Sequence, residues 1–272
     1  MAEHSRFVLH RPHRWHIQEA GTGPTLLLLH GAGGATQSWR GLFPLLAQNH
    51  HVIAIDLPGQ GFSQSGARHR LGLRTMAEDL DALIAAEGWS LDAIIGHSAG
   101  VALALQLALT AGMDQTKIVG INGALSTFKG VAGFMFPVMA KVLSATPFTA
   151  DLFAATASSP QSVARLIGNT GSTLPPSDLT FYQRLVKDRS HVDGTLAMMA
   201  QWELEPLLAN LPKLQMPTLL LAAENDRAVP PETSRKAAAQ MPNASFELVP
   251  KLGHLMHEED PDLICARIKA FL

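Results

Sequence analysis

Short apolar segments recur along the chain and alternate with longer segments whose apolar residues repeat at helical spacing. The short segments have the length of buried strands; they are residues 25–29, 52–55, 93–95, 118–121, 218–222 and 246–249. Residues 14–20 form a further candidate strand, which a turn from Gly21 to Pro24 ends. Strands that alternate with helices predict an α/β fold, with a mostly parallel central sheet flanked by helices on both faces.

Two helices are expected in the first half of the chain. One ends near Gly88, and five residues share its apolar face: Leu73, Met76, Leu80, Leu83 and Ile84. The other covers residues 99–111 and is apolar nearly all round. Such a helix is expected to be buried against the sheet.

The alternation breaks between residues 125 and 211. Helical patterns separated by proline and glycine cover residues 130–144, 160–166, 177–187 and 191–201, the last extending toward Leu208. The core pattern resumes at Met216. An all-helical insertion in an α/β chain predicts a lid over the sheet. We therefore assign residues 1–124 and 212–272 to the core, and 125–211 to a helical lid.

The composition is that of a folded globular protein. Of 272 residues, 47% are hydrophobic and 16% are charged, which excludes a disordered chain. The formal net charge is −2 and no basic run stands out, so nucleic acid is not an expected partner. One cysteine, Cys265, excludes an internal disulfide. No run of apolar residues is long enough to form a transmembrane helix. Residues 1–16 lack the apolar stretch of a signal peptide, so we expect a cytoplasmic protein.

The sharpest local motif is Gly96-His97-Ser98-Ala99-Gly100, which lies between a predicted strand and a predicted helix. A G-x-S-x-G turn in this context holds a nucleophilic serine in a strained conformation. The flanking glycines are needed because larger side chains would collide with the neighbouring backbone. The motif predicts Ser98 as a nucleophile. Within it, His97 is expected to pack and hydrogen-bond beneath that serine.

A serine needs a base and a group that orients the base. In such a fold the chain order is serine, acid, histidine. Asp226 follows the strand at 218–222, and His254 follows the strand at 246–249. We therefore predict a Ser98–His254–Asp226 triad at the carboxyl edge of the sheet. Glu224 is the rival acid, and for His257 we expect a surface or capping role.

The turn His30-Gly31-Ala32-Gly33-Gly34 follows the first parallel strand. Its glycines let backbone amides face a site, and we predict an oxyanion hole formed by the amides of Ala32 and Ala99. The turn lacks the lysine of a phosphate-binding loop. No cysteine or carboxylate joins His10, His13 and His16 to complete a metal site. We therefore expect a solvated strand edge there, and neither metal nor cofactor.

Together these motifs resemble the α/β-hydrolase superfamily in residues 14–124 and 212–272. The resemblance rests on the turn at 30–34, the segment Asp56-Leu57-Pro58-Gly59-Gln60-Gly61-Phe62-Ser63, the serine elbow, Asp226 and Gly253-His254. Many members carry a second glycine after the elbow, where this chain has Val101. We expect that difference to change helix packing and no catalytic residue.

Segments outside those motifs resemble a narrower group, the magnesium chelatase accessory proteins of bacteriochlorophyll biosynthesis. They are residues 122–125, 168–172, 182–186 and 198–208, of which Trp202–Leu208 is the most telling. This resemblance implies a role in photosynthetic pigment synthesis near the magnesium chelatase step. A tetrapyrrole would then be a candidate ligand, and chelatase subunits would be candidate partners.

The residues predict a serine hydrolase that cleaves carboxylic esters. The substrate is expected to be small and apolar because residues 130–143 are rich in Val, Phe and Met, although the same residues could simply bury the lid against the core. The alternative is a non-catalytic accessory protein that binds a porphyrin or a chelatase subunit. A membrane-surface role rests on residues 130–143 alone.

Overall fold

The computed structural model describes residues 2–126 and 159–272. Within them, one eight-stranded sheet has the order β1-β2-β4-β3-β5-β6-β7-β8. β1 pairs antiparallel with β2, and β2 pairs antiparallel with β4, whereas the remaining neighbours are parallel. The strands are β1 (Ser5–His10), β2 (His13–Ala20), β3 (Thr25–Leu29), β4 (His51–Ile55), β5 (Leu91–His97), β6 (Lys117–Ile121), β7 (Thr218–Ala223) and β8 (Ala244–Val249).

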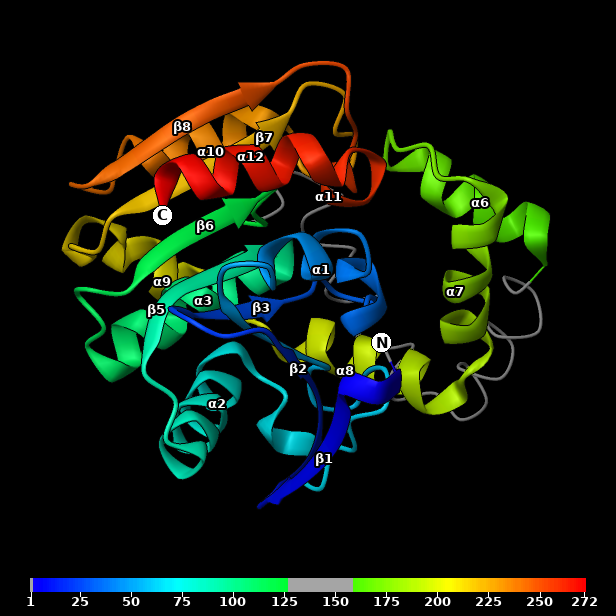
Figure 1. Ribbon diagram of the computed structural model, residues 1–272, viewed down its shortest axis with the longest axis horizontal. Helices are drawn as coiled ribbons and strands as arrows, with labels where there is room; N and C mark the ends of the chain where they lie inside the picture. Colours follow the sequence, from blue (N-terminus) through cyan, green and yellow to red (C-terminus); the bar gives the residue numbers. More distant parts are fainter. Residues whose placement is uncertain (1, 127–158) are drawn as a thin grey trace.

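Helices cover both faces of this sheet (Figure 1). The helices are α1 (Leu42–Leu46), α2 (Leu73–Glu87), α3 (Ala99–Ala111), α6 (Pro160–Asn169), α7 (Pro176–Lys187), α8 (Arg189–Gln201), α9 (Glu205–Asn210), α10 (Pro231–Ala238), α11 (Met256–Glu259) and α12 (Pro261–Phe271). Short 3-10 turns are η1 (Ala2–His4), η2 (Thr36–Trp39), η3 (Arg68–Arg70) and η4 (Leu211–Lys213).

The core divides into two layers because successive residues of a buried strand point to opposite faces. On β3, Leu27 and Leu29 pack with α2 and α3, whereas Leu26 and Leu28 pack with α1 and α12. α3 lies wholly in the first layer, and residues 99–108 are all buried. The predicted α/β architecture, with a mostly parallel sheet flanked by helices, is therefore confirmed.

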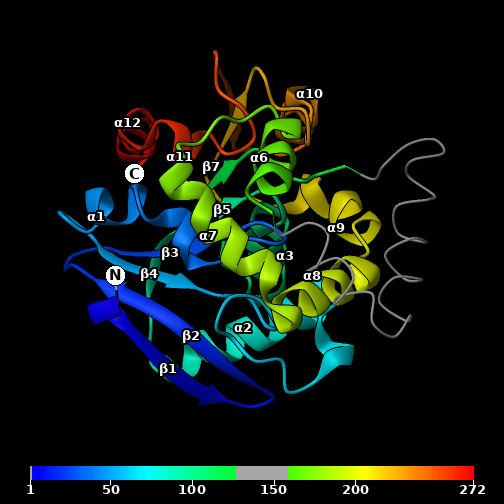
Figure 2. The same cartoon turned by 90° about the vertical axis from the view of Figure 1, so that its right-hand side faces the viewer.

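Helices α6, α7 and α8 lie at the edge toward which the parallel strands point (Figures 1 and 2). Two hydrogen bonds join the loop between α6 and α7 to the core there: Arg227 N donates to Thr170 O at 3.0 Å, and Leu255 N donates to Ser172 Oγ at 2.7 Å. The expected helix at 130–144 and its apolar side chains lie outside the described residues. The helix predicted from residue 191 toward Leu208 ends at Gln201, and α9 begins separately at Glu205.

At the start of the chain the sequence left one strand unpredicted, and one expectation is wrong. β1 was not anticipated, because charged and histidine residues interrupt its apolar ones. His13 and His16 are buried rather than solvated. Each imidazole bonds to a distant carboxylate: His13 Nε2 lies 3.0 Å from Asp79 Oδ2, and His16 Nδ1 lies 2.7 Å from Asp56 Oδ2. Each carboxylate thus gives one ring nitrogen of its histidine a partner in place of water, whereas His13 Nδ1 is buried without a hydrogen bond among the described residues.

Candidate active site

Ser98 sits between the end of β5 and the start of α3, with φ 52° and ψ −114°. A residue with a side chain rarely adopts this conformation, which costs on the order of 1–3 kcal/mol. The flanking glycines permit the sharp turn. A Cβ at Gly96 would lie 2.5 Å from Gly100 O, and a Cβ at Gly100 would overlap Leu29 O. The first turn of α3 therefore packs directly on the end of β3.

Backbone hydrogen bonds hold Ser98 in this conformation. Its N–H donates to Ile121 O at 2.9 Å, and its carbonyl accepts from Ala124 N at 3.1 Å. Both partners belong to β6 or the segment after it. Val101, which replaces the more common glycine, packs above Gly120, where a Cβ would lie 2.7 Å from Val101 Cγ1. Gly120 on β6 thus leaves room for the larger side chain on α3.

Asp226 and His254 are brought together in the loops that follow β7 and β8. His254 Nδ1 lies 2.7 Å from Asp226 Oδ2, and both residues are buried. Asp226 Oδ1 accepts from the amides of Ala228 and Val229, each at 2.8 Å. The carboxylate is thereby fixed. It orients the imidazole so that Nδ1 carries the proton, while Nε2 faces away from Asp226. Glu224 instead accepts from Lys251 N at 3.1 Å and is exposed.

The carbonyl of His254 is fixed by two further donors. Asn122 Nδ2 donates to His254 O at 2.8 Å, and His97 Nε2 donates to the same oxygen at 2.9 Å. Asn122 Oδ1 also accepts from Ala223 N at 2.7 Å. The sequence analysis did not single out Asn122 for the site. Its position directly after β6 was the available signal, because polar residues at the carboxyl ends of parallel strands gather at one edge.

Ser98 lies beside these groups and beside the glycine turn at 30–34. The rings of His97 and His254 have centroids 4.7 Å apart. A Cβ at Gly31 would lie 2.9 Å from both Ser98 Cβ and His97 Nδ1. Among the described residues, Ser98 Oγ makes no hydrogen bond. In unliganded sites the bond from a serine to its base is often long and tightens only with substrate.

Residues 31–34 form a turn with the features of type II. Gly34 N donates to Gly31 O at 3.0 Å, and Gly33 has φ 75°. His30 Nδ1 donates to Gly31 O at 2.8 Å, and its Nε2 accepts from Leu57 N at 2.9 Å. The N–H and C=O of a trans peptide point in opposite directions. Because Gly31 O is held from within the protein, the Ala32 N–H points the other way.

Two amides are thereby available at this edge. Within residues 2–126 and 159–272, neither the Ala32 N–H nor the Ala99 N–H donates a hydrogen bond. Ala99 is the first residue of α3, where amides lack a partner inside the helix. Free donors near a nucleophile are the feature that an oxyanion hole requires.

His257 is fully buried, so the expected surface or capping role is wrong. Its ring lies between Trp39, at 4.8 Å, and His97, at 4.4 Å between centroids. Neither ring nitrogen has a hydrogen-bond partner among the described residues. Burial, with the neighbouring His254, lowers the pKa of His257 to about 3. The residue is therefore neutral and supports the loop that carries His254.

Sequence analysis also missed an ionic cluster between α7 and the core. Arg40 bonds to Glu258 of α11 and to Asp178 of α7, and Tyr182 of α7 donates to the same glutamate. Glu258 is nearly inaccessible, and burial raises its pKa to about 7. No local pattern reveals this cluster, because its members are spread over more than 200 residues of sequence.

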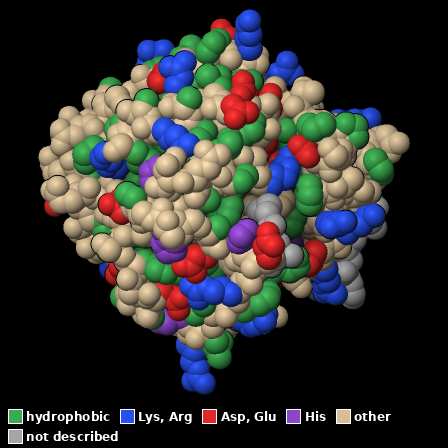
Figure 3. Space-filling view, viewed as in Figure 1, with side chains coloured by type: hydrophobic (Ala, Val, Ile, Leu, Met, Phe, Trp, Pro, Cys, Tyr) green, Lys and Arg blue, Asp and Glu red, His purple; other side chains and the backbone are tan. Residues whose placement is uncertain are grey.

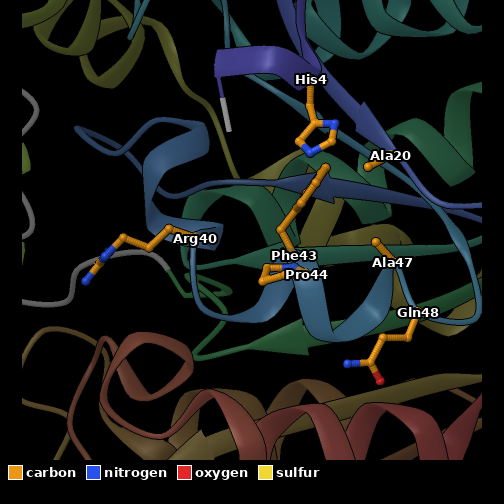
Figure 4. A pocket seen from close by; sticks show the side chains of 7 residues that line it. All are labelled: His4, Ala20, Arg40, Phe43, Pro44, Ala47 and Gln48. Carbon is orange, nitrogen blue, oxygen red and sulfur yellow. The ribbon is translucent and has the colours of Figure 1, made fainter.

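A separate hollow lies beside α1, away from Ser98 (Figure 4). It is lined by His4, Ala20, Arg40, Phe43, Pro44, Ala47 and Gln48. In Figure 4 the Arg40 side chain extends away from the other lining residues. Because Arg40 is already paired with Asp178 and Glu258, it offers this hollow no free charge.

On the face of the molecule shown in Figure 3, acidic and basic side chains are interspersed.

Known proteins share this fold. A family model described as the alpha/beta hydrolase fold matches residues 24–261. An alpha/beta hydrolase fold protein from Burkholderia ambifaria superposes with a TM-score of 0.81 at 24% identity, covering 97% of this chain and 96% of that one. The chain therefore belongs to the α/β-hydrolase superfamily, as its motifs predicted.

Two relatives within this superfamily carry more specific names. The magnesium-chelatase 30 kDa subunit of Rhodobacter capsulatus is 44% identical over 263 residues, which cover 96% of this chain and 92% of that one. The pimeloyl-(acyl-carrier protein) methyl ester esterase of Nitrosospira multiformis is 26% identical, covering 94% of this chain and 97% of that one. The predicted resemblance to chelatase-associated hydrolase-fold proteins is thus confirmed. In the described part of the chain, no helix is long and apolar enough to span a membrane.

Proposed function

We propose that this protein is a serine hydrolase that cleaves an ester-like bond in an apolar substrate, with Ser98, His254 and Asp226 as its triad. The observation that carries the proposal is the 2.7 Å bond between His254 Nδ1 and Asp226 Oδ2, at the edge where Ser98 adopts φ 52°. An ester hydrolase among the relatives supports the same reaction class.

The reaction follows from the roles of these groups. His254 Nε2 takes the proton of Ser98 as its oxygen attacks the acyl carbon, and Asp226 stabilises the imidazolium that forms. The Ala32 and Ala99 amides donate to the oxyanion of the tetrahedral intermediate. His254 then gives its proton to the leaving group. Water, activated by the same imidazole, releases the acyl group and restores Ser98.

The biological setting that we propose is pigment synthesis near the magnesium chelatase step. It is supported by the 44% identity to a protein named as a chelatase subunit. That name also favours a second candidate, in which the fold binds a porphyrin or a chelatase subunit without catalysis. The two candidates differ in whether the Ser98 hydroxyl is needed.

Labelling with a fluorophosphonate probe tests the chemistry. We expect mass spectrometry of the labelled protein to find the phosphonyl group on Ser98. Ser98→Ala should lose both the label and the hydrolysis of a p-nitrophenyl ester, with a loss on the order of a million-fold. Ser190→Ala, which removes an exposed hydroxyl on α8, is the matched control and should behave like the wild type. Absence of label on wild-type Ser98 would contradict the proposal.

Complementation separates the two candidates in the cell. In a pigment-producing host that lacks its own copy, Ser98→Ala should fail to restore pigment if catalysis is the biological role. An accessory surface would tolerate the loss of one hydroxyl. Full pigment synthesis with this variant would therefore reject catalysis as the role, even if the purified wild type hydrolysed test esters.

A further inference from the structure

One face of α8 rests on the glycine turn at 31–34 and on the neighbouring loop at 59–61. The contacting residues are spaced i, i+3, i+4 and i+7, so they share one side of the helix. They are His191, Gly194, Thr195 and Met198. No other described helix bonds to both loops.

His191 makes the polar contacts of this face. Its Nδ1 accepts from Gly61 N at 2.9 Å, and its Nε2 lies 3.2 Å from Gly33 O. An imidazole that accepts at Nδ1 and remains neutral carries its proton on Nε2, so Nε2 donates to Gly33 O. The side chain is buried, and burial lowers the pKa of His191 to about 4. The ring is therefore neutral and keeps this tautomer at neutral pH.

The rest of the face leaves little room for movement. A Cβ at Gly194 would overlap Gly59 O, so helix and loop backbones are in direct contact. Met198 Sδ lies 3.2 Å from Gln60 Nε2, while Gln60 Oε1 accepts from Gly33 N at 2.8 Å. Both backbone groups of Gly33 are thus held, its N–H by Gln60 and its carbonyl by His191.

We infer that α8 positions the oxyanion-binding turn, and that His191 is the positioning residue, acting through Gly33 on the neighbouring Ala32 amide. The inference rests on the proposed serine hydrolase function. His191 does not touch the reacting atoms. It holds the second half of the turn whose first half presents the Ala32 N–H. An oxyanion donor must be fixed before the reaction, because its contribution comes from preorganisation.

Two substitutions separate the two bonds of the imidazole. The amide nitrogen of a glutamine can reach the position of His Nε2 and donate to Gly33 O. The amide oxygen of an asparagine can replace Nδ1 and accept from Gly61 N. His191→Ala removes both bonds. Val192→Ala is the control, because it truncates the neighbouring buried residue of α8 and leaves the His191 bonds in place.

Hydrolysis of a p-nitrophenyl ester by the full-length variants gives the test. We expect His191→Ala to lower kcat by about 10- to 100-fold with KM changed less than threefold, because the turn acts on the transition state. His191→Gln should recover most of kcat, and His191→Asn should not. Val192→Ala should lower the melting temperature without this loss of kcat. Wild-type kcat in folded His191→Ala, or equal recovery by Asn and Gln, would overturn the inference.

Hydrogen exchange of the amides keeps the inference separate from the proposed function. In His191→Ala, the Gly61 and Gly33 amides should exchange at least tenfold faster than in the wild type, whereas Val192→Ala should leave both unchanged. If the wild type neither hydrolyses esters nor reacts with a fluorophosphonate, the proposed function fails, and faster exchange would still support positioning by α8. Unchanged exchange in His191→Ala would refute that positioning whatever the activity.

Discussion

Asn122 Nδ2 lies 2.8 Å from the carbonyl oxygen of His254, so the end of β6 directly supports the loop that carries the imidazole. The same amide reaches Gly253 O at 3.2 Å. Asn122 has φ 50°, a conformation that asparagine tolerates better than most residues. The side chain of Asn122, directly after β6, therefore joins that strand end to the end of β7 and to the His254 loop.

Asn122→Gly should separate this support from the backbone conformation, because glycine adopts φ 50° without strain. The variant leaves the Ala223 amide and the Gly253 carbonyl without partners. We expect it to lower the free energy of unfolding by about 1–3 kcal/mol. We also expect kcat to fall while KM changes little, since His254 loses its register to Ser98. Urea unfolding and ester hydrolysis measure the two effects, and an unchanged kcat would show that His97 alone suffices.

A matched pair of substitutions tests Asp226 as the acid of the proposed triad. Asp226→Asn keeps an oxygen for the Ala228 and Val229 amides but turns an NH₂ group toward His254 Nδ1. That arrangement favours the wrong tautomer, and the analogous change in a well-studied serine protease lowers kcat by about 10⁴-fold. Glu224→Gln alters the exposed rival carboxylate and should leave kcat within about twofold. Comparable losses in both variants would contradict the assignment of Asp226.

Most of the sheet could be predicted because buried parallel strands are continuous apolar runs. Residues 25–29 and 218–223, for example, are almost wholly apolar and almost wholly buried. β1 could not be predicted in this way, since its half-exposed residues include Ser5, Arg6 and His10. Its pairing with β2 across residues 11 and 12 stabilises it, and that Arg-Pro pair lacks the Asn-Gly or Gly-X signal from which such a hairpin is recognised.

The candidate site shows the same limit. Ser98, Asp226 and His254 could be proposed because each follows a recognisable strand. His191 could not, because its partners Gly33 and Gly61 lie more than 120 residues away. His257 was misjudged for a related reason, since Trp39 and His97 bury it only after the chain has folded. Contacts between distant segments decide which polar residues are buried. The local spacing of residues does not predict these contacts.

Glu258 should give the protein a distinct pH dependence. Its pKa is raised from 4.5 to about 7 in the folded state, chiefly by burial. Between these values the unfolded chain releases the proton while the folded chain keeps it. The contribution of Glu258 to the free energy of unfolding therefore falls as pH rises from about 4.5 to 7. One pKa unit corresponds to about 1.4 kcal/mol, so the fall is on the order of 3 kcal/mol.

Comparison of wild type with Glu258→Gln isolates this contribution. Buried histidines with lowered pKa, such as His257 and His191, push stability the opposite way in both proteins and cancel in the difference. Urea unfolding at pH 5, 6 and 7 should show wild type losing stability relative to Glu258→Gln as pH rises. Glu232→Gln, on an exposed surface, should show no such trend. A difference that is flat with pH would mean that Arg40 and Tyr182 keep Glu258 ionised.

Two glycine-to-alanine changes should shift stability in opposite directions. Both glycines lie in helices, where alanine is intrinsically favoured by about 1 kcal/mol. At Gly168 of α6, a Cβ meets nothing within 4 Å, so we expect the change to stabilise by about 0.5 kcal/mol. At Gly100, a Cβ would overlap Leu29 O where α3 packs on β3, and the resulting strain should destabilise by about 3 kcal/mol. Relief of this overlap would move the start of α3 and displace Ser98. Ester hydrolysis should therefore fall with Gly100→Ala and not with the change at Gly168. Equal melting temperatures for the two variants would show that α3 can move away from β3 without strain, contrary to the close packing at the elbow.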